Sequence, residues 1–543
     1  MIWTDQRLRA VPALTALLAG LMLMPGAAIA RPPLSASDWL SGSIKQPDNI
    51  SAWRPGDARP PEAKSRKKDI AKSGAVEPVG VTRLGEGNAD GKGSVSARTA
   101  GLPNDLWGAG DGESIARLVR STDARLPALR RLQRRILAAQ LDPPATQPGG
   151  EGELFLARVD KLLDMGATGA AKELIRAAGP ADPERFRRMF DIALLSGDEA
   201  QACEIMDRTP GVAPSFPARI FCLALGGDWA AAALVFHGAD TSGLIDQRMA
   251  ALLAQYLDDG YSDKADLLTP PDVVTPLDLR LHEAVGQPLP SASLPLAFSL
   301  ADLDENGGWK ARLDAAERLA RAGAIPASQL RAIYLEQRPA ASGGVWDRAD
   351  AIQRLDAVLT SRDVVGVQEI LPKAFDRMVA AGLGTALADM AGARAASLPL
   401  TGRAGQIGLW LAIEAGQWQV VQPPPEDATA FDLWLLDFAS GLADARPPSG
   451  TGSDRAERLL AGFSATPIPP AAAQLIAEKR QGEAMLLAIT DTDAGLDGDL
   501  TRATQGLRVL RELGQGEIAR QAAIELILAP VIGSLPGALA TNP

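Results

Sequence analysis

Histidine, cysteine and tyrosine are scarce in this chain. Its 543 residues include two histidines, two cysteines and three tyrosines, and aromatic residues make up 4% of the total. The histidines, His237 and His282, form no His-Glu-x-x-His pattern and do not lie at ligand spacing, and no Gly-x-Ser-x-Gly elbow is present. Zinc hydrolases and enzymes with a Ser-His-Asp triad are therefore not indicated. We expect a protein without catalysis, cofactor or metal.

Sequence typical of strands is scarce as well. Runs of Val, Ile, Tyr and Thr are few, whereas 46% of the residues are hydrophobic, with Leu and Ala prominent among them. Leu and Ala lose little side-chain freedom in a helix, and a chain of this length can bury a large core. The composition predicts an all-α fold.

A helix-then-glycine motif recurs at nearly constant spacing in the middle of the chain. Its glycines are Gly166, Gly197, Gly227 and Gly260, which lie 31, 30 and 33 residues apart. Each glycine follows one apolar helical stretch and precedes another, so we expect it in the left-handed position between paired helices. A period of this size predicts stacked helical hairpins, which form an αα-superhelical solenoid. Further hairpin glycines with looser spacing are Gly323, Gly382, Gly416 and Gly514.

The stretch from Glu153 to Leu268 resembles the tetratricopeptide-like family of α-solenoids. Gly227 to Ala233 reads Gly-Asp-Trp-Ala-Ala-Ala-Ala, which is similar to the start of the second helix of such a unit. The units are slightly shorter than the usual ~34 residues and lack the family's full Trp/Gly/Tyr/Pro pattern. The order of leader, polar arm and Ala-rich helices also resembles uncharacterised exported proteins of proteobacteria. The resemblance implies a TPR-like hairpin solenoid.

The first thirty residues have the pattern of a secretory signal peptide. Arg7 and Arg9 provide the positive start, Val11 to Met24 the apolar stretch, and Ala28 to Ala30 a small-x-small cleavage site. The apolar stretch is short for a membrane-spanning helix, and no later segment is long and apolar enough to be one. We expect cleavage after Ala30 and a periplasmic protein.

A basic arm is expected to follow the leader. Residues 31 to 100 contain 12 Lys/Arg and 8 Asp/Glu in a Pro/Gly/Ser-rich stretch, whereas the whole chain carries a net charge of −11. Such a segment cannot bury enough apolar surface to fold alone. Trp39, Leu40 and Ile44 form an apolar island in it that is expected to dock either on a partner or on the chain's own body. Trp107 is expected to cap the first helices.

The two cysteines are predicted to form a disulfide. Cys203 and Cys222 fall in consecutive helices and are equidistant from the centre of the connector between them, so an antiparallel pair would place them at the same level. Closing a loop of this length is worth roughly 3 kcal/mol in the chain-entropy model. The alternative is two buried free thiols, which an oxidising compartment disfavours.

Two acidic loops come close to a calcium-binding pattern. They are Asp302 to Gly307 and Asp491 to Asp499. The twelfth position, which should supply a bidentate Glu, is Leu313 in the first and Arg502 in the second. Helix capping by Asp and Asn explains the same residues. A loose structural calcium site is the alternative.

The predicted organisation has eight parts. They are a signal peptide (1–30), a disordered arm rich in Pro, Gly, Ser and Lys (31–112), TPR-like helical repeats (113–268), a Pro-rich connector (269–296), a second helical block (297–440), a loop (441–456), C-terminal helices (457–530) and a flexible tail (531–543). The second block either continues the solenoid or forms a separate bundle.

These features favour a protein that binds envelope proteins as a scaffold or accessory factor, because solenoids offer extended concave surfaces. Nucleic acid is not an expected partner, because the helical body is acidic. Two alternatives stay open. One is a peptidoglycan-acting enzyme of the lytic-transglycosylase type, whose members also carry α-superhelical domains, although no Glu-Ser catalytic signature is found. The other is a structural or stress-related envelope protein with no defined partner.

Overall fold

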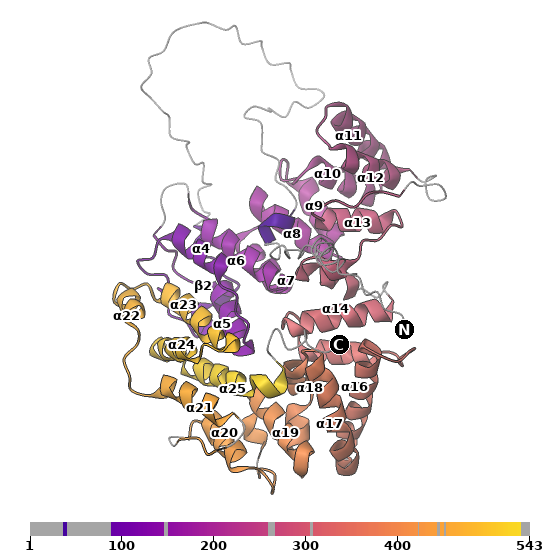
Figure 1. The fold of residues 1–543 in the computed structure, drawn as a ribbon. Coiled ribbons are helices and arrows are strands. Elements are labelled where there is room, and N and C mark those ends of the chain that lie inside the picture. Colours follow the sequence, from indigo (N-terminus) through magenta and orange to yellow (C-terminus); the bar gives the residue numbers. More distant parts are fainter. Residues whose placement is uncertain are drawn as a thin grey trace, which may run out of the picture. The chain divides into compact units, whose positions relative to one another are not determined.

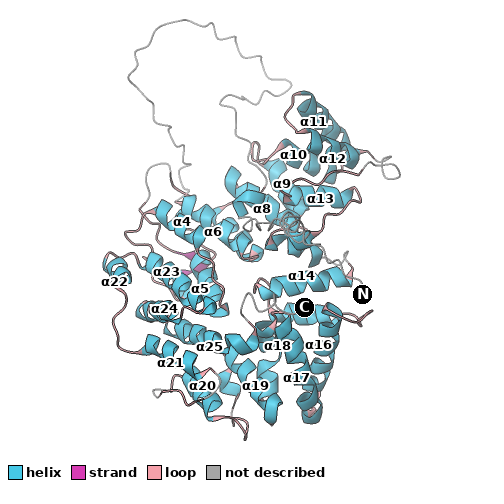
Figure 2. Ribbon diagram, viewed as in Figure 1, coloured by secondary structure: helices cyan, strands magenta, loops and turns pink. Residues whose placement is uncertain are grey.

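The computed structural model describes residues 36–40, 88–145, 150–258, 267–303, 308–421, 423–442, 446–449 and 452–533 (Figure 1). These residues form an all-α structure with one very short pair of strands (Figure 2). The elements up to the first long helix pair are α2 (Ala36–Trp39), η2 (Ala89–Gly91), β1 (Val95–Ser96), α3 (Ala97–Ala100), α4 (Gly112–Ser121), α5 (Pro127–Ala138) and β2 (Ala139–Gln140).

The middle of the chain is a succession of helices. They are α6 (Glu153–Asp164), α7 (Thr168–Ala178), α8 (Pro183–Ser196), α9 (Glu199–Arg208), α10 (Phe216–Leu225), α11 (Trp229–Thr241), α12 (Gln247–Leu257), α13 (Pro276–Ala284), η3 (Ser291–Ser293), η4 (Leu296–Leu303), α14 (Trp309–Arg321), α15 (Ala327–Leu335), α16 (Val345–Thr360), α17 (Val364–Ala380), α18 (Gly384–Ala396) and α19 (Gly402–Glu414).

The C-terminal part is built in the same way. Its elements are η5 (Trp418–Val420), α20 (Ala430–Ser440), α21 (Ser453–Leu460), η6 (Ala461–Phe463), α22 (Pro470–Ala477), α23 (Gln481–Asp493), η7 (Ala494–Asp497), α24 (Leu500–Glu512) and α25 (Gly516–Ile532).

Helices that follow one another in sequence pack against each other, as helical hairpins require. The pairs α8 and α9, α10 and α11, α16 and α17, and α18 and α19 are all in contact. Gly227 shows how a hairpin turns: its φ is +84°, and the N–H of Asp228 donates to the carbonyl of Leu223 at 2.9 Å, which satisfies a carbonyl at the end of α10. The predicted hairpin glycines within the described residues all have positive φ: Gly166, Gly197, Gly227, Gly323, Gly382, Gly416 and Gly514. The prediction of helical hairpins is confirmed, and Gly260 lies outside the described residues.

Residues 88 to 112, which the sequence places in a disordered arm, are folded in the structure. β1 pairs in parallel with β2, and the carboxylate of Asp90 accepts hydrogen bonds from the N–H groups of Gly152 and Phe155 at the start of α6. The composition of this stretch does not reveal its order, because the residues that it pairs with lie ~44 to 65 residues further along the chain. Apart from residues 36–40, the stretch from 31 to 87 lies outside the described residues, as do the signal peptide and residues 534–543 of the expected tail.

The Pro-rich connector also contains structure that the sequence did not indicate. Within residues 269–296, α13 begins at Pro276, and Leu277 and Leu281 on it are buried. Proline is tolerated at the first position of a helix because the N–H it lacks would have no intrahelical partner there. Thr275 and Asp278 complete a capping box before it. One hydrophobic core then runs through both helical blocks.

The first helices of this body pack against the last. α5 contacts α25, and α4 contacts α23 (Figure 1). The two oxygens of Glu525 on α25 accept hydrogen bonds from the N–H of Ala128 at the start of α5, at 3.0 and 2.9 Å. Trp107 is buried against Gly482 of α23, so it packs on the chain's own body, at a helix far along the sequence from the first helices that it was expected to cap. None of the described helices is long and apolar enough to cross a membrane.

Candidate functional site: an arginine-lined cavity

Helix α5 carries four arginines within its 12 residues. Leu129, Leu132 and Ile136 face the core and are fully buried, which leaves the remaining positions for Arg130, Arg131, Arg134 and Arg135. Residues four apart lie on the same side of a helix. Arg130 and Arg134 therefore project together.

Arg130, Arg131 and Arg134 line a cavity of about 630 Å³, a volume within the range of small-molecule sites, about 300–1,000 Å³. We call it the arginine-lined cavity. It lies where α5 meets the ends of α14, α17 and α25 and the starts of α15 and α18. The charged residues in its wall are five arginines and one carboxylate: Arg125, Arg130, Arg131, Arg134, Arg321 and Asp389. A basic cavity is unexpected in a chain with a net charge of −11.

Two of the five arginines have no carboxylate partner among the described residues. Arg130 donates to the carbonyls of Arg321 and Arg125, at 2.9 and 2.8 Å, and Arg134 donates to the carbonyl of Gly323. Both guanidinium groups thus cap the C-terminal end of α14, where the helix dipole favours positive charge. Backbone carbonyls are neutral, so the full charge of both groups remains in the cavity wall.

The other three arginines are paired with acids. Arg125 forms an ion pair with Asp497 and Arg321 one with Glu317 at 2.9 Å. Arg131 lies 3.4 Å from the Glu525 carboxylate.

The pKa values of Arg130 and Arg134 reflect burial and neighbouring charges. Burial lowers the pKa of the Arg134 guanidinium, and the nearby charges of Arg130 and Arg131 lower the pKa further. Burial likewise lowers the pKa of Arg130, against the opposing effect of Glu525 and Asp493. Arginine stays protonated in proteins even so. Arg134 is therefore held among positive charges that repel it, those of Arg130 and Arg131.

Two buried acids, Glu414 at the end of α19 and Glu525 on α25, act electrostatically on one another. Glu414 accepts a hydrogen bond from the hydroxyl of Thr385 at 3.2 Å with one oxygen, while its other oxygen has no partner among the described residues. Burial, together with the charge of Asp389, raises the pKa of Glu414 to about 7. Burial and the nearby Glu414 hold the pKa of Glu525 well above its usual range. Both shifts favour the protonated, uncharged form of the acid.

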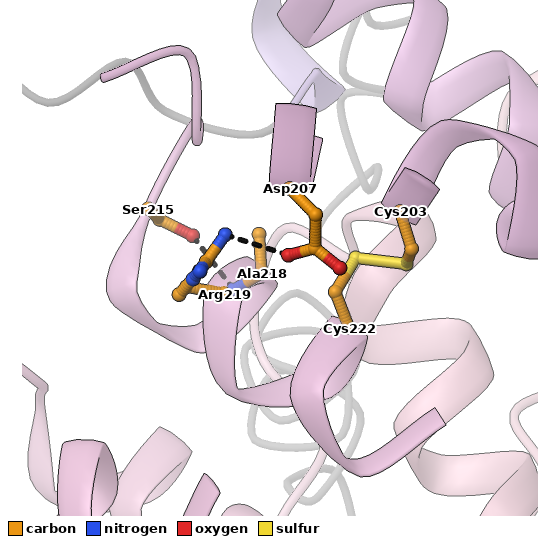
Figure 3. Close-up of a disulfide and its surroundings, with 6 residues drawn as sticks. All are labelled: Cys203, Asp207, Ser215, Ala218, Arg219 and Cys222. Carbon is orange, nitrogen blue, oxygen red and sulfur yellow. Dashed lines mark hydrogen bonds and ion pairs between the residues drawn. A yellow bond between two sulfur atoms is a disulfide. The ribbon is translucent and has the colours of Figure 1, made fainter. Parts of the chain in front are cut away.

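The predicted disulfide is confirmed. Cys203 on α9 and Cys222 on α10 are joined, with Cα atoms 5.2 Å apart, and neither cysteine is free (Figure 3). Ser215 caps the start of α10 by accepting from the N–H of Ala218 at 3.2 Å, and Arg219 pairs with Asp207 across the hairpin at 2.9 Å (Figure 3). The disulfide and the ion pair join the two helices, and the Ser215 cap fixes the start of α10.

The expected docking motif lies against the chain's own body. Trp39 is 1% exposed, and its ring packs edge-on against Phe298 of η4 with centroids 5.2 Å apart. Leu40 is buried as well, and α2 contacts α6. Ile44 lies outside the described residues. Of the two expected docking surfaces, the structure shows the chain's own body for Trp39 and Leu40.

The second acidic loop is occupied by the chain's own donors. Asp493 accepts from the backbone N–H groups of Arg125 and Leu126, and Asp497 pairs with Arg125. Asp491 pairs with Arg502, and Asp499 caps α24. No group of three or more His, Cys, Asp or Glu side chains suited to a metal occurs in the described part of the chain. The first acidic loop lies mostly outside that part.

Neither histidine lines the arginine-lined cavity. His282 on α13 is buried, and burial lowers the pKa of its imidazole. His237 is exposed on α11.

Comparison with known proteins found no matching family model, no similar curated protein and no similar solved structure.

The cavity could not be predicted from the sequence. The sequence shows arginines between apolar positions in α5, a pattern that is usually a solvated face. Four arginines within six residues and no acid among them is the signal that could have marked the site. The partners Gly323 and Arg321 lie ~190 residues away, so the enclosure of the arginines has no local trace.

Proposed function

We propose that the protein is an exported, periplasmic helical-repeat protein of TPR-like architecture that acts without catalysis, as a scaffold or accessory factor in an envelope assembly. The arginine-lined cavity is its recognition site. The observation that carries the proposal is the pair Arg130 and Arg134, which keep their charge inside a cavity of ligand size without a carboxylate partner among the described residues. If Arg130 and Arg134 only capped α14, carboxylates beside them would not interfere with that role.

The rest of the molecule supports a binding role. Sequential hairpins provide a rigid framework, and a recognition site built on helices is held more precisely than one on loops. The disulfide between Cys203 and Cys222 fits an oxidising compartment such as the periplasm.

The test places a negative charge in the arginine-lined cavity without removing an arginine. Ala327 lines the cavity and is the first residue of α15, where a glutamate is favourable to the helix. Ala327→Glu therefore supplies an internal anion while leaving the caps on α14 in place. Ala471→Glu, in the first turn of α22 and exposed, is the matched control.

We expect in-cell crosslinking and co-purification to recover the same envelope protein with the wild-type chain and with Ala471→Glu, and to lose it with Ala327→Glu. Equal recovery with all three chains would place recognition elsewhere. A parallel deletion of residues 41–87, which removes none of the described residues, tests whether the basic arm carries the contact instead.

A further inference from the structure

The arginine-lined cavity has the features of a site for one kind of anion. Its two unpaired guanidinium groups converge: a β-carbon on Gly323 would lie 3.4 Å from Nη1 of Arg130 and 3.7 Å from Nη2 of Arg134. The carbonyls of Arg321 and Gly323 fix the orientation of both groups. Glu525 and Asp493 act on Arg130 from a distance, but neither forms an ion pair with Arg130 or Arg134. The two guanidinium groups repel each other, and a bound anion relieves that repulsion.

Two helix starts border the same cavity. α15 begins at Ala327 and α18 at Gly384, and neither has a side-chain cap. Ala327 and Thr385 line the cavity. The N–H groups of a first turn have no intrahelical acceptors and attract anions.

The start of α5 provides the contrast within the same cavity wall. Its N–H groups are bound by the carboxylates of Asp493 and Glu525, which reach them from α23 and α25. The fold thus supplies its own anions to one helix start and none to the other two. Other helices of the chain, such as α7 and α14, also start without a side-chain cap, so the two unpaired arginines carry the argument and the helix starts add donors beside them.

The number and direction of the donors favour a phosphate over a carboxylate. A carboxylate is planar, carries one charge and satisfies one guanidinium fork, whereas a phosphate carries up to two charges and offers tetrahedral oxygens to several donors at once. The cavity is also larger than a phosphate alone. Its wall includes apolar groups that could contact an attached organic part: Ala320, Ala324, Ile325, Pro326 and Ala386.

We propose that the arginine-lined cavity binds a phosphate group, held between Arg130 and Arg134 and the N-termini of α15 and α18. This inference rests on the proposed function, for which it names the chemistry that the cavity recognises. The phosphate is either a free ion or the phosphoryl group of a larger ligand.

Isothermal titration calorimetry on the chain from Arg31 onward, at constant ionic strength, tests the ligand class. The probes are inorganic phosphate, pyrophosphate, glycerol 3-phosphate and citrate. We expect pyrophosphate or glycerol 3-phosphate to bind about tenfold or more tightly than citrate. Preference for glycerol 3-phosphate over inorganic phosphate assigns the site to a phosphorylated organic ligand, and the reverse assigns it to the free ion.

Three variants locate the binding. Ala327→Glu and Arg130→Gln/Arg134→Gln are expected to weaken phosphate binding about tenfold or more, and Arg117→Gln/Arg208→Gln, which changes two exposed arginines on α4 and α9, to leave it unchanged. Should the double glutamine variant misfold, Ala327→Glu still decides. Wild-type affinity in Ala327→Glu, or no binding of any phosphate probe to the wild type, overturns the inference. If citrate alone binds, or if no probe binds while Ala327→Glu still loses the envelope partner, the phosphate assignment fails and the proposed function stands.

Discussion

Buried charged side chains need hydrogen-bond partners inside the protein, and Arg158 shows this most clearly. It is fully buried on α6 and donates to four backbone carbonyls, those of Asp90, Lys92, Leu137 and Ala139. Burial lowers its pKa to about 10, so it remains charged at neutral pH. One side chain thereby joins α6, the end of α5 and the segment before β1.

Replacing Arg158 with methionine should destabilise this junction strongly. The substitution removes the donor from three buried carbonyls and one partly buried carbonyl, at a cost of about 3 kcal/mol or more. Hydrogen exchange should show faster opening of α6 and of residues 88–96. Arg117→Met, at a position where the side chain is 61% exposed, should stay within about 0.5 kcal/mol of wild type. Equal exchange in the two variants would mean that Arg158 does not hold the segment.

Glu414 predicts a pH dependence with a definite sign. Its pKa rises from 4.5 to about 7 in the folded protein, so the folded state binds more protons than the unfolded state between these values. Stability should therefore fall as pH rises from about 4.5 to about 7, by up to roughly 3 kcal/mol for this group. Glu414→Gln should flatten that part of the profile, as measured by urea unfolding between pH 5 and 8. A variant with the same slope as wild type would show that other groups set it.

Individual helices follow from local sequence more closely than any other feature. The hairpin glycines were predictable because a left-handed residue between two helices leaves a mark at a single position. The disulfide was predictable because Cys203 and Cys222 belong to the same hairpin. α13 and the segment from 88 to 96 were not predictable. α13 follows a Pro-rich stretch and starts at a capping box, and the segment from 88 to 96 supplies backbone acceptors to Arg158. Neither feature produces a hydrophobic periodicity in the sequence.

The disulfide should matter chiefly to its own hairpin. Its loop spans 19 residues, and opening it should cost about 3 kcal/mol of local stability in the chain-entropy model. Cys203→Ser/Cys222→Ser should raise the exchange rates of amides in α9 and α10 while leaving α16 and α17 at wild-type rates. A reductant should reproduce the effect in wild type and add nothing in the variant. Uniform loss of protection across both hairpins would contradict a local role.

Contacts between distant parts of the chain decide what the molecule can bind. A solenoid built only from neighbour contacts would leave α5 far from α25, whereas Glu525 binds the start of α5 across 397 residues. The arginine-lined cavity exists only because α5, α14, α15 and α18 come together there. Each of its arginines was visible in the sequence, but their enclosure was not, since periodicity reports which face of a helix is apolar and not what covers its polar face.

Binding of an anion in the arginine-lined cavity should stabilise α5 and the first turns of α15 and α18 together. Hydrogen exchange of the chain from Arg31 onward, with and without pyrophosphate, measures this directly. We expect slower exchange in α5 and in the first turns of α15 and α18 on addition of pyrophosphate, and no such change in Ala327→Glu. Unchanged exchange at all three places, or the same slowing in Ala327→Glu, would show that the arginine-lined cavity is not an anion site.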